Sequence, residues 1–456
     1  MMNPASFLTA SLRTHPAGEG MARVMAAAIN AVDPREAVLR HLERDGHSLR
    51  VGDRHYDLQT VRRVWVAGAG KAGYPMAQAV EDTLGAWIAG GLVIVKDGYA
   101  PETARLPHIE IAFAAHPVPD ERGVEATRRI LSLLQQADAD DLVLCLFSGG
   151  GSALLTAPAG GISLADVQAL TASLLACGAA IDEINALRKH IDQVKGGALA
   201  RMAAPARVAA LILSDVIGDR LDVIASGPCF PDSTTFSTAW EVVKRYDLAE
   251  RLPASIRARL QAGLRGEIAE TPKPGDPLFE RVQNLIVASN LQAARAALHQ
   301  ARAEGWHTLL LTTFLQGEAS QAGRALASIA RQVAATGEPL PRPACLIAGG
   351  ETTVTLRGQG LGGRNQELAL GAVMEMSGLE NAFLAALATD GGDGPTDAAG
   401  AVVSGETLAR ARSSGLQPGR FLAHNDAYHF FQPLGDLLFP GPTRTNVNDL
   451  AFLFLL

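Results

Sequence analysis

The sequence predicts an α/β protein with two domains. Its dominant rhythm is a short apolar or β-branched run, then a glycine-rich turn, then a segment with helical periodicity. This order is typical of β-α units that build a parallel sheet. The length of 456 residues exceeds the usual size of one core. Hydrophobic residues make up 48% and charged residues 19%, which fits well-buried globular domains and argues against disorder.

The elements of the first half follow this rhythm after a helical stretch at about 20–45. An apolar run at 64–66 leads through AGAGKAG into a helix at about 73–84. Further strands are expected at 92–95, 109–113, 142–147 and 208–213, and further helices at 121–137, 164–177 and 181–203.

A change of pattern between about 228 and 282 suggests a domain boundary. PCFPDSTTF, LPASI and TPKPGDPLF contain many prolines and separate short helical pieces, as in a connector. We therefore expect an N-terminal domain at 1–240, a connector at 241–282 and a C-terminal domain at 283–456. In the C-terminal domain we expect strands at 285–288, 308–313, 345–348 and 383–388, and helices at 290–304 and 318–336.

Composition and charge exclude several classes of function. The net charge of −7 leaves no electrostatic footprint for nucleic acid. The four cysteines form no C-x-x-C pair, so neither zinc nor a redox dithiol is expected. The first 20 residues lack the apolar core of a signal peptide, and no stretch of 18 apolar residues appears. We expect a cytoplasmic protein without a membrane partner.

The first glycine loop (residues 67–73, AGAGKAG) is a candidate phosphate-binding loop because it follows a strand and opens a helix. Gly68 and Gly70 fit the pattern G-x-G-x-x-G. A dinucleotide site would place an acid at the end of the next strand, but Asp97 lies further on and follows a lysine. A tight β-α turn is the alternative. Lys71 favours phosphoryl transfer, since an ammonium group neutralises charge on a migrating phosphoryl group.

The second glycine loop (residues 148–152) consists of Ser148, Gly149, Gly150, Gly151 and Ser152 and follows a buried strand. Three consecutive glycines cost backbone entropy and serve no packing purpose. They are suited to a nest of backbone N–H groups that binds phosphate or carboxylate. Neither a Walker A loop nor a nucleophile elbow is present, and a merely tight turn is the alternative.

Four aspartates are candidate magnesium ligands. Asp215 and Asp219 follow a strand in SDVIGD, and Asp390 and Asp393 lie in the glycine-rich segment TDGGDGPTDAAG. Mg²⁺ takes a few carboxylates and otherwise keeps water and phosphates. Turn formation and helix capping explain the same residues equally well.

The segment GGETTVTLRGQGLGGRNQE contains three further candidates. Glu351 follows a strand end, and a glycine-rich loop then leads to Arg364 and Asn365 at the start of a helix. A guanidinium group suits a carboxylate or a phosphoryl group. An arginine at a helix start opposes the helix dipole, so its position there indicates a bound anion. We consider Glu351 and Asn365 as substrate-binding residues.

Taken in order, these motifs resemble one family, the two-domain glycerate 2-kinases whose C-terminal part is called the MOFRL domain. The resemblance extends from about residue 20 to the end. It rests on GAGKAG, AAHPVPD, SGGGSALL, NALRKHIDQVKGG, LILSDVIGD, ASGPCFPD, GGETTVTLRGQGLGGRNQE, ATDGGDGPTDAAGA and TNVNDLAFLFL.

The resemblance implies a specific fold and reaction. It implies two α/β/α sandwich domains, the first Rossmann-like and the second containing the MOFRL region at about 340–452, with the active site in the cleft between them. It implies phosphorylation of D-glycerate at its 2-hydroxyl by ATP, with Mg²⁺ or another divalent cation, to give 2-phosphoglycerate and ADP. A critical lysine and arginine of the family correspond to Lys71 and Arg364. A homo-oligomer is compatible with the sequence.

Two rival functions remain to be weighed. Proteins of this kind have also been labelled hydroxypyruvate reductases, which would use NAD(P)H. The absence of an acidic ribose ligand in its usual place argues against that function. A module that binds sugar acids without catalysis would leave Lys71 and the three consecutive glycines unexplained.

Overall fold

The computed structural model describes all 456 residues and divides them into two compact units. One unit comprises Pro34–Val287, and the other combines Met1–Asp33 with Ala288–Leu456. This division differs from the expected boundaries at two places. The first 33 residues belong with the C-terminal part because α2 (Gly18–Ala31) packs against α12 (Asn290–Ala303). The expected connector at 241–282 belongs to the unit Pro34–Val287.

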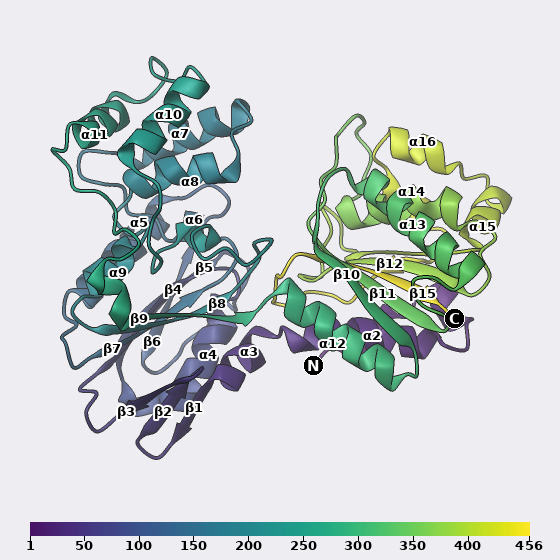
Figure 1. The fold of residues 1–456 in the computed structure, drawn as a ribbon, viewed down its shortest axis with the longest axis horizontal. Helices are drawn as coiled ribbons and strands as arrows, with labels where there is room; N and C mark the ends of the chain where they lie inside the picture. The colour runs from purple at the N-terminus through teal and green to yellow at the C-terminus, as the bar shows by residue number, and fades with distance from the viewer. The chain divides into compact units, whose positions relative to one another are not determined.

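The unit Pro34–Val287 is built on a six-stranded sheet (Figure 1). Its strand order is β6-β5-β4-β7-β8-β9, and neighbouring strands from β6 to β8 run parallel. Numbered along the chain this is the order 3-2-1-4-5-6 of doubly wound folds. The strands are β4 (Val64–Ala69), β5 (Ile88–Lys96), β6 (Ile109–Ala114), β7 (Leu142–Phe147), β8 (Arg207–Leu213) and β9 (Val282–Ala288).

Burial explains the long apolar runs of this sheet. Every residue of β4 and of β7 is buried, as expected for parallel strands covered on both faces. One face packs against α5 (Glu121–Leu134), α6 (Gly151–Leu154) and α9 (Ala198–Ala203), while α4 (Gly73–Leu84) packs against β5 and β7.

Two helices predicted from the sequence differ from those in the structure. The expected helix at 20–45 is two helices, α2 and α3 (Pro34–His41), followed by an antiparallel sheet of β1 (Leu42–Asp45), β2 (Ser48–Val51) and β3 (Arg54–Asp57). The expected helix at 181–203 is interrupted between α8 (Ile181–His190) and α9, because Gly196 and Gly197 adopt positive φ angles.

Four helices form a second apolar core in the unit Pro34–Val287. Figure 1 shows them at the upper end of this unit. They are α7 (Leu164–Ala176), α8, α10 (Phe236–Arg245) and α11 (Ala254–Leu264). The proline-rich segments predicted as a connector join these helices to the sheet.

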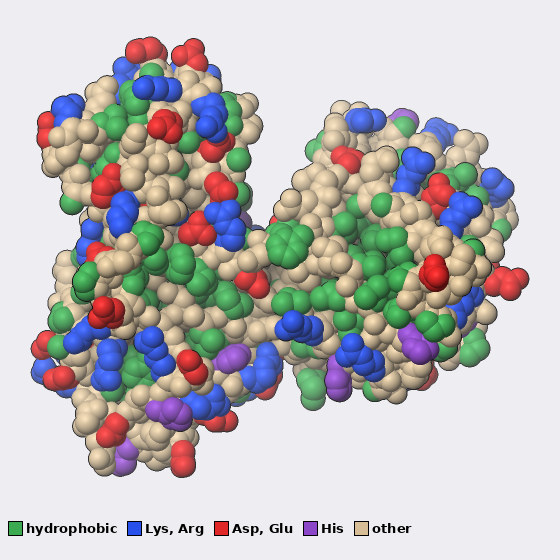
Figure 2. Space-filling model, in the orientation of Figure 1, with side chains coloured by type: hydrophobic (Ala, Val, Ile, Leu, Met, Phe, Trp, Pro, Cys, Tyr) green, Lys and Arg blue, Asp and Glu red, His purple; other side chains and the backbone are tan.

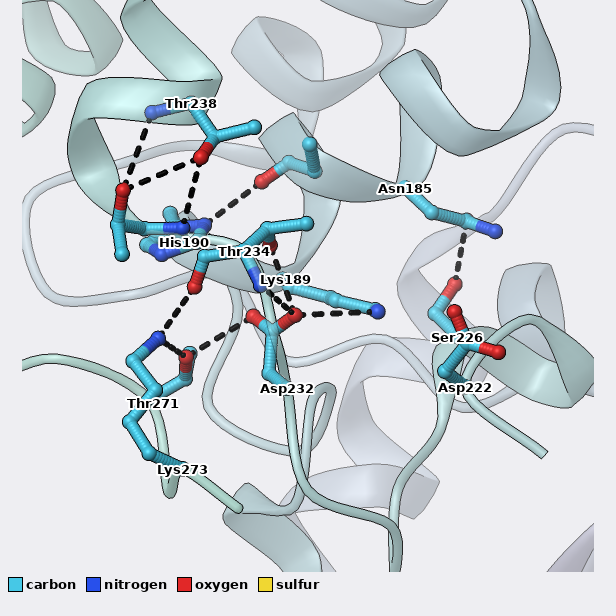
Figure 3. Close-up of polar contacts among 12 residues, drawn as sticks. Asn185, Lys189, His190, Asp222, Ser226, Asp232, Thr234, Thr238, Thr271 and Lys273 are labelled. Atoms are coloured by element: carbon cyan, nitrogen blue, oxygen red, sulfur yellow. Dashed lines mark hydrogen bonds and ion pairs between the residues drawn. The ribbon is translucent and has the colours of Figure 1, made fainter.

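A buried polar network holds that junction (Figure 3). Lys189 and Asp232 form an ion pair at 3.2 Å, and their side chains are 3% and 0% exposed. Thr234 and Thr271 also donate hydrogen bonds to the Asp232 carboxylate. Burial opposes ionisation, but Lys189 and the Thr234 hydrogen bonds outweigh it and lower the pKa of Asp232.

The other unit contains a mixed six-stranded sheet with the order β10-β11-β15-β12-β13-β14. Only β10 and β11 pair in parallel. In Figure 1, α2 and α12 lie on one side of this sheet, and α13 (Ala319–Thr336) and α14 (Arg364–Met376) lie on the other. The strands are β10 (His307–Leu315), β11 (Ala344–Gly350), β12 (Ala382–Ala388), β13 (Gly400–Ser404), β14 (Leu437–Leu438) and β15 (Asp449–Leu455).

The surface carries both signs of charge. Figure 2 shows basic and acidic side chains interspersed on the visible face, with apolar side chains between them. None of the helices combines the length and apolar character needed to cross a membrane.

Asp232→Ala tests the buried network at the junction. Removing the carboxylate leaves Lys189 charged and buried, so we expect the free energy of unfolding to fall by about 3–5 kcal/mol. Urea denaturation measures this value. The matched control is Glu267→Ala, which breaks an exposed pair with Arg265 and should leave stability nearly unchanged. Equal effects of the two substitutions would contradict a structural role for the network.

Candidate functional site

The two glycine loops follow the adjacent central strands β4 and β7. The chain leaves β4 toward β5 on one side of the sheet and leaves β7 toward β8 on the other. This reversal is a topological switch point, where open α/β sheets bind ligands beyond the carboxyl ends of their strands. The sheet thus places both loops where a ligand site is expected.

Direct hydrogen bonds hold the two glycine loops together. The amide of Lys71 donates to the carbonyl oxygen of Gly149 at 2.8 Å. The amide of Ala72 donates to the hydroxyl of Ser148 at 3.0 Å. Gly70 makes this approach possible, since a Cβ atom there would lie 2.1 Å from the Ser148 hydroxyl oxygen. The loops form one rigid surface of backbone groups.

Side chains from two further strand ends border the second glycine loop. A Cβ atom on Gly149 would lie 2.3 Å from Oδ2 of Asp215, which follows β8. A Cβ atom on Gly150 would lie 3.0 Å from the ring of His116, which follows β6, and Gly150 has a φ angle of +83°. Gly149 and Gly150 thus have a packing role, contrary to the expectation from the sequence, because they let Asp215 and His116 lie directly against the backbone.

The charges around these loops favour an anion. No hydrogen bond or ion pair engages the Lys71 ammonium group, and its Nζ atom lies 5.9 Å from the centroid of the Tyr99 ring. Burial, together with the positive charges of Lys71 and Lys96, lowers the pKa of His116 to about 4. His116 is therefore neutral at neutral pH. No side chain caps the N-terminus of α4, which begins two residues after Lys71.

Ser152 is fixed by a chain of hydroxyl groups. Its hydroxyl lies 2.7 Å from that of Ser226, which donates to Oδ1 of Asn185 at 2.9 Å. Ser226 is fully buried and has a φ angle of +62°, an unfavourable conformation for a serine. Neither Ser226 nor Asn185 was predicted as a site residue, although each lies in a motif of the resemblance, ASGPCFPD or NALRKHIDQVKGG, because their contact joins positions 41 residues apart.

In the other unit, Arg364 is engaged by two acids. Its Nε and Nη2 atoms donate to the Asp449 carboxylate at 2.5 and 3.2 Å, and Nη1 donates to Oε1 of Glu351 at 2.5 Å. The anion expected beside this arginine is therefore supplied in part by the protein. Asp449 is nearly buried, whereas the Glu351 side chain is 42% exposed. Burial raises the pKa of Asp449 to about 7, although Arg364 favours its ionised form.

Asp393 caps helix α14. Its Oδ1 atom accepts hydrogen bonds from the amide and the side chain of Asn365, and its Oδ2 atom accepts one from the amide of Gln366. Asp393 and Asn365 are both 2% exposed. Both carboxylate oxygens of Asp393 therefore serve the helix N-terminus, and magnesium binding by this residue stays a prediction. Asn365 likewise lies within the cap.

The remaining acids do not form a dense metal site. No three histidine, cysteine, aspartate or glutamate residues are grouped so as to hold a metal ion. Asp390 accepts a hydrogen bond from the amide of Gly392, as in an Asx turn. Asp219 lies in a turn with a φ angle of +54°. Asp215 is the one candidate that lies against a glycine loop.

Comparison with known proteins gives concordant results. Family models match residues 20–261 (Domain of unknown function, DUF4147) and residues 344–449 (MOFRL family). A glycerate 2-kinase from Pyrococcus horikoshii is 42% identical over 430 residues, covering 94% of this chain and 95% of that protein. A D-glycerate 2-kinase from Thermotoga maritima is 45% identical over 388 residues, covering 85% and 89%.

A solved structure points to the same family. The crystal structure of a glycerate kinase from Thermotoga maritima matches with a TM-score of 0.84 at 40% identity and covers 95% of this chain and 98% of that one. A different name occurs among the relatives. A putative hydroxypyruvate reductase from Agrobacterium vitis is 40% identical over 435 residues, covering 95% of this chain and 93% of that protein.

The titration of His116 tests the geometry around the first glycine loop. We expect NMR to give a pKa of about 4 for His116, against an ordinary 6.5, and a higher pKa in Lys71→Ala because one positive charge is removed. Between pH 6.5 and about 4, His116 takes up a proton in the unfolded chain but not in the folded chain. The titration of His116 therefore lowers the free energy of unfolding as the pH falls from 6.5 to about 4. An unchanged pKa in Lys71→Ala would contradict the proximity of the two side chains.

Proposed function

The chain belongs to the glycerate 2-kinase family, and from this premise we propose that it transfers the terminal phosphoryl group of ATP to the 2-hydroxyl of D-glycerate. The products are 2-phosphoglycerate and ADP. Membership of the family makes the protein a kinase that acts on glycerate. The observation that carries the finer proposal is the pair of hydrogen-bonded glycine loops beside the unpaired ammonium group of Lys71.

The glycine loops suit the phosphate groups of the nucleotide. Backbone N–H groups bind phosphate without net positive charge, and the N-terminus of α4 adds a favourable dipole. Lys71 neutralises charge that develops on the phosphoryl group during transfer. His116, being neutral, adds a polar ring without a competing negative charge. In phosphoryl transfer, positioning and charge neutralisation provide most of the rate enhancement.

Asp215 is the residue that fits a magnesium ion. Magnesium sites in kinases use one or two carboxylates and complete their coordination with nucleotide phosphates and water. The contact of Asp215 with the second glycine loop meets that requirement. When bound with ATP, the ion would supply charge neutralisation between the phosphate groups.

Arg364 is the second residue that we propose to act in the reaction. Asp449 holds two of its nitrogen atoms from a buried position and so fixes the plane of the guanidinium group. Glu351 is the exposed partner and the one that an anionic ligand can displace. A planar, oriented guanidinium group is suited to a transferring phosphoryl group.

The reductase function is disfavoured by the end of β5. Asp97 is the acid nearest the position that holds a nicotinamide dinucleotide ribose, and both of its carboxylate oxygens accept hydrogen bonds from Arg122, at 3.0 and 2.6 Å. Lys96 precedes it and places a positive charge beside His116. Neither feature supports binding of a ribose hydroxyl.

An enzymatic assay tests the proposal. With D-glycerate, Mg²⁺ and ATP we expect ADP release, and enolase should consume the product directly. Lys71→Ala should lower kcat by roughly a hundredfold or more because charge stabilisation is lost. The control is Lys244→Ala, which removes an exposed lysine from α10.

Three outcomes would contradict the proposal. A product that enolase accepts only after addition of a phosphoglycerate mutase would move the phosphate to another hydroxyl. Consumption of NADH with hydroxypyruvate, without ADP formation, would favour the reductase. Full turnover by a folded Lys71→Ala protein would remove Lys71 from the mechanism.

A further inference from the structure

Arg188 is a largely buried arginine without a partner. It lies in the last turn of α8, and no hydrogen bond or ion pair engages its guanidinium group. Burial lowers its pKa, an effect that nearby Asp192 only partly offsets. An arginine stays charged in proteins, so an isolated, largely buried guanidinium group is costly unless an anion joins it.

The Arg188 side chain lines a small pocket beside the second glycine loop. Ser152, Pro119, Asp192 and Lys195 line the same pocket. Ser152 ends the second glycine loop, and Pro119 belongs to the segment that follows β6 and contains His116. The pocket therefore lies at the carboxyl edge of the sheet, next to the proposed phosphate site.

The other charged groups of the pocket are already satisfied. Lys195 donates to the carbonyl oxygens of Ser152 and Leu155 at 2.8 and 2.7 Å and lies 3.6 Å from Asp192. Asp192 accepts hydrogen bonds from the amides of Ala157 and Val194. The charges of Lys195 and Asp192 balance each other. The charge of Arg188 is therefore the one uncompensated positive charge in the pocket.

Ser152 adds a hydrogen-bond acceptor to this pocket. Ser226 donates its only hydroxyl proton to Asn185, so the proton between Ser152 and Ser226 comes from Ser152. The Ser152 oxygen therefore retains lone pairs for a hydroxyl group of a ligand. A single positive charge next to a hydroxyl acceptor matches a small hydroxy carboxylate.

We propose that Arg188 binds the carboxylate of glycerate and that Ser152 accepts a hydrogen bond from one of its hydroxyl groups. This inference rests on the proposed function and assigns the substrate to a place beside the phosphate site. The pocket volume of about 20 Å³ excludes a nucleotide base. A carboxylate carries the one negative charge that Arg188 requires, whereas the phosphates have Lys71 and the glycine loops. Arg364 is then left for the phosphoryl group.

Kinetics of Arg188→Gln test the assignment. We expect the KM for D-glycerate to rise roughly ten- to a hundredfold, as for loss of a charged hydrogen bond, while the KM for ATP changes by less than about twofold. Glycerol lacks the carboxylate, so the preference of the enzyme for glycerate over glycerol should fall by a similar factor. Arg251→Gln, an exposed arginine between α10 and α11, is the matched control and should leave these values unchanged.

Calorimetric titration with D-glycerate separates this inference from the proposed function. If the wild-type protein binds D-glycerate and Arg188→Gln does not, the pocket assignment holds even without ADP release, and only the proposed reaction fails. A rise in the KM for ATP with an unchanged KM for glycerate would overturn the assignment, since Arg188 would then serve phosphate. Unchanged glycerate binding in Arg188→Gln would also overturn it. Arg188→Lys provides the same test if Arg188→Gln does not fold.

Discussion

The hydrogen bonds between the two glycine loops are the constraint on which the proposed chemistry depends. They join the turn after β4 to the turn after β7 through Lys71, Ala72, Ser148 and Gly149. A side chain at Gly70 would separate the loops, and side chains at Gly149 or Gly150 would displace Asp215 or His116. The glycines are thus required by close approach of backbone to backbone and of side chain to backbone. Lys71, Asp215 and His116 owe their common surroundings to this contact.

Two arginines illustrate two ways of handling buried positive charge. Arg364 is balanced by Asp449 and Glu351 within the protein, so its orientation is set before any ligand binds. Arg188 has no such partner, and its charge is left for a ligand. The first arrangement suits a group that must be aimed at a reacting phosphoryl group. The second suits substrate recognition, since an anion gains most where a buried charge is uncompensated.

The sequence predicted those features that depend on local patterns. Apolar runs followed by glycine-rich turns located β4, β7 and both glycine loops, and they pointed to Lys71. Features that depend on long-range contacts were missed. Arg364 and Asp449 are 85 positions apart, and no local pattern reveals their pairing. For Asp393 the sequence left turn or cap formation open beside metal binding, because a capping aspartate and a metal ligand look alike in a glycine-rich loop. Arg188 lies in the motif NALRKHIDQVKGG, but its role was not predicted, because only its burial beside Ser152 points to a ligand.

The most direct test of this account is the binding of a non-hydrolysable ATP analogue to Gly70→Ala, measured by calorimetry on protein shown to be folded. A Cβ atom at Gly70 would lie within 3 Å of the Ser148 backbone and force the loops apart. The account predicts that affinity falls by roughly tenfold or more, because small displacements in such sites are costly. Gly160→Ala, where a Cβ atom would meet nothing, should bind as the wild type does. Wild-type affinity in folded Gly70→Ala would contradict the claim that the joined glycine loops bind the nucleotide phosphates.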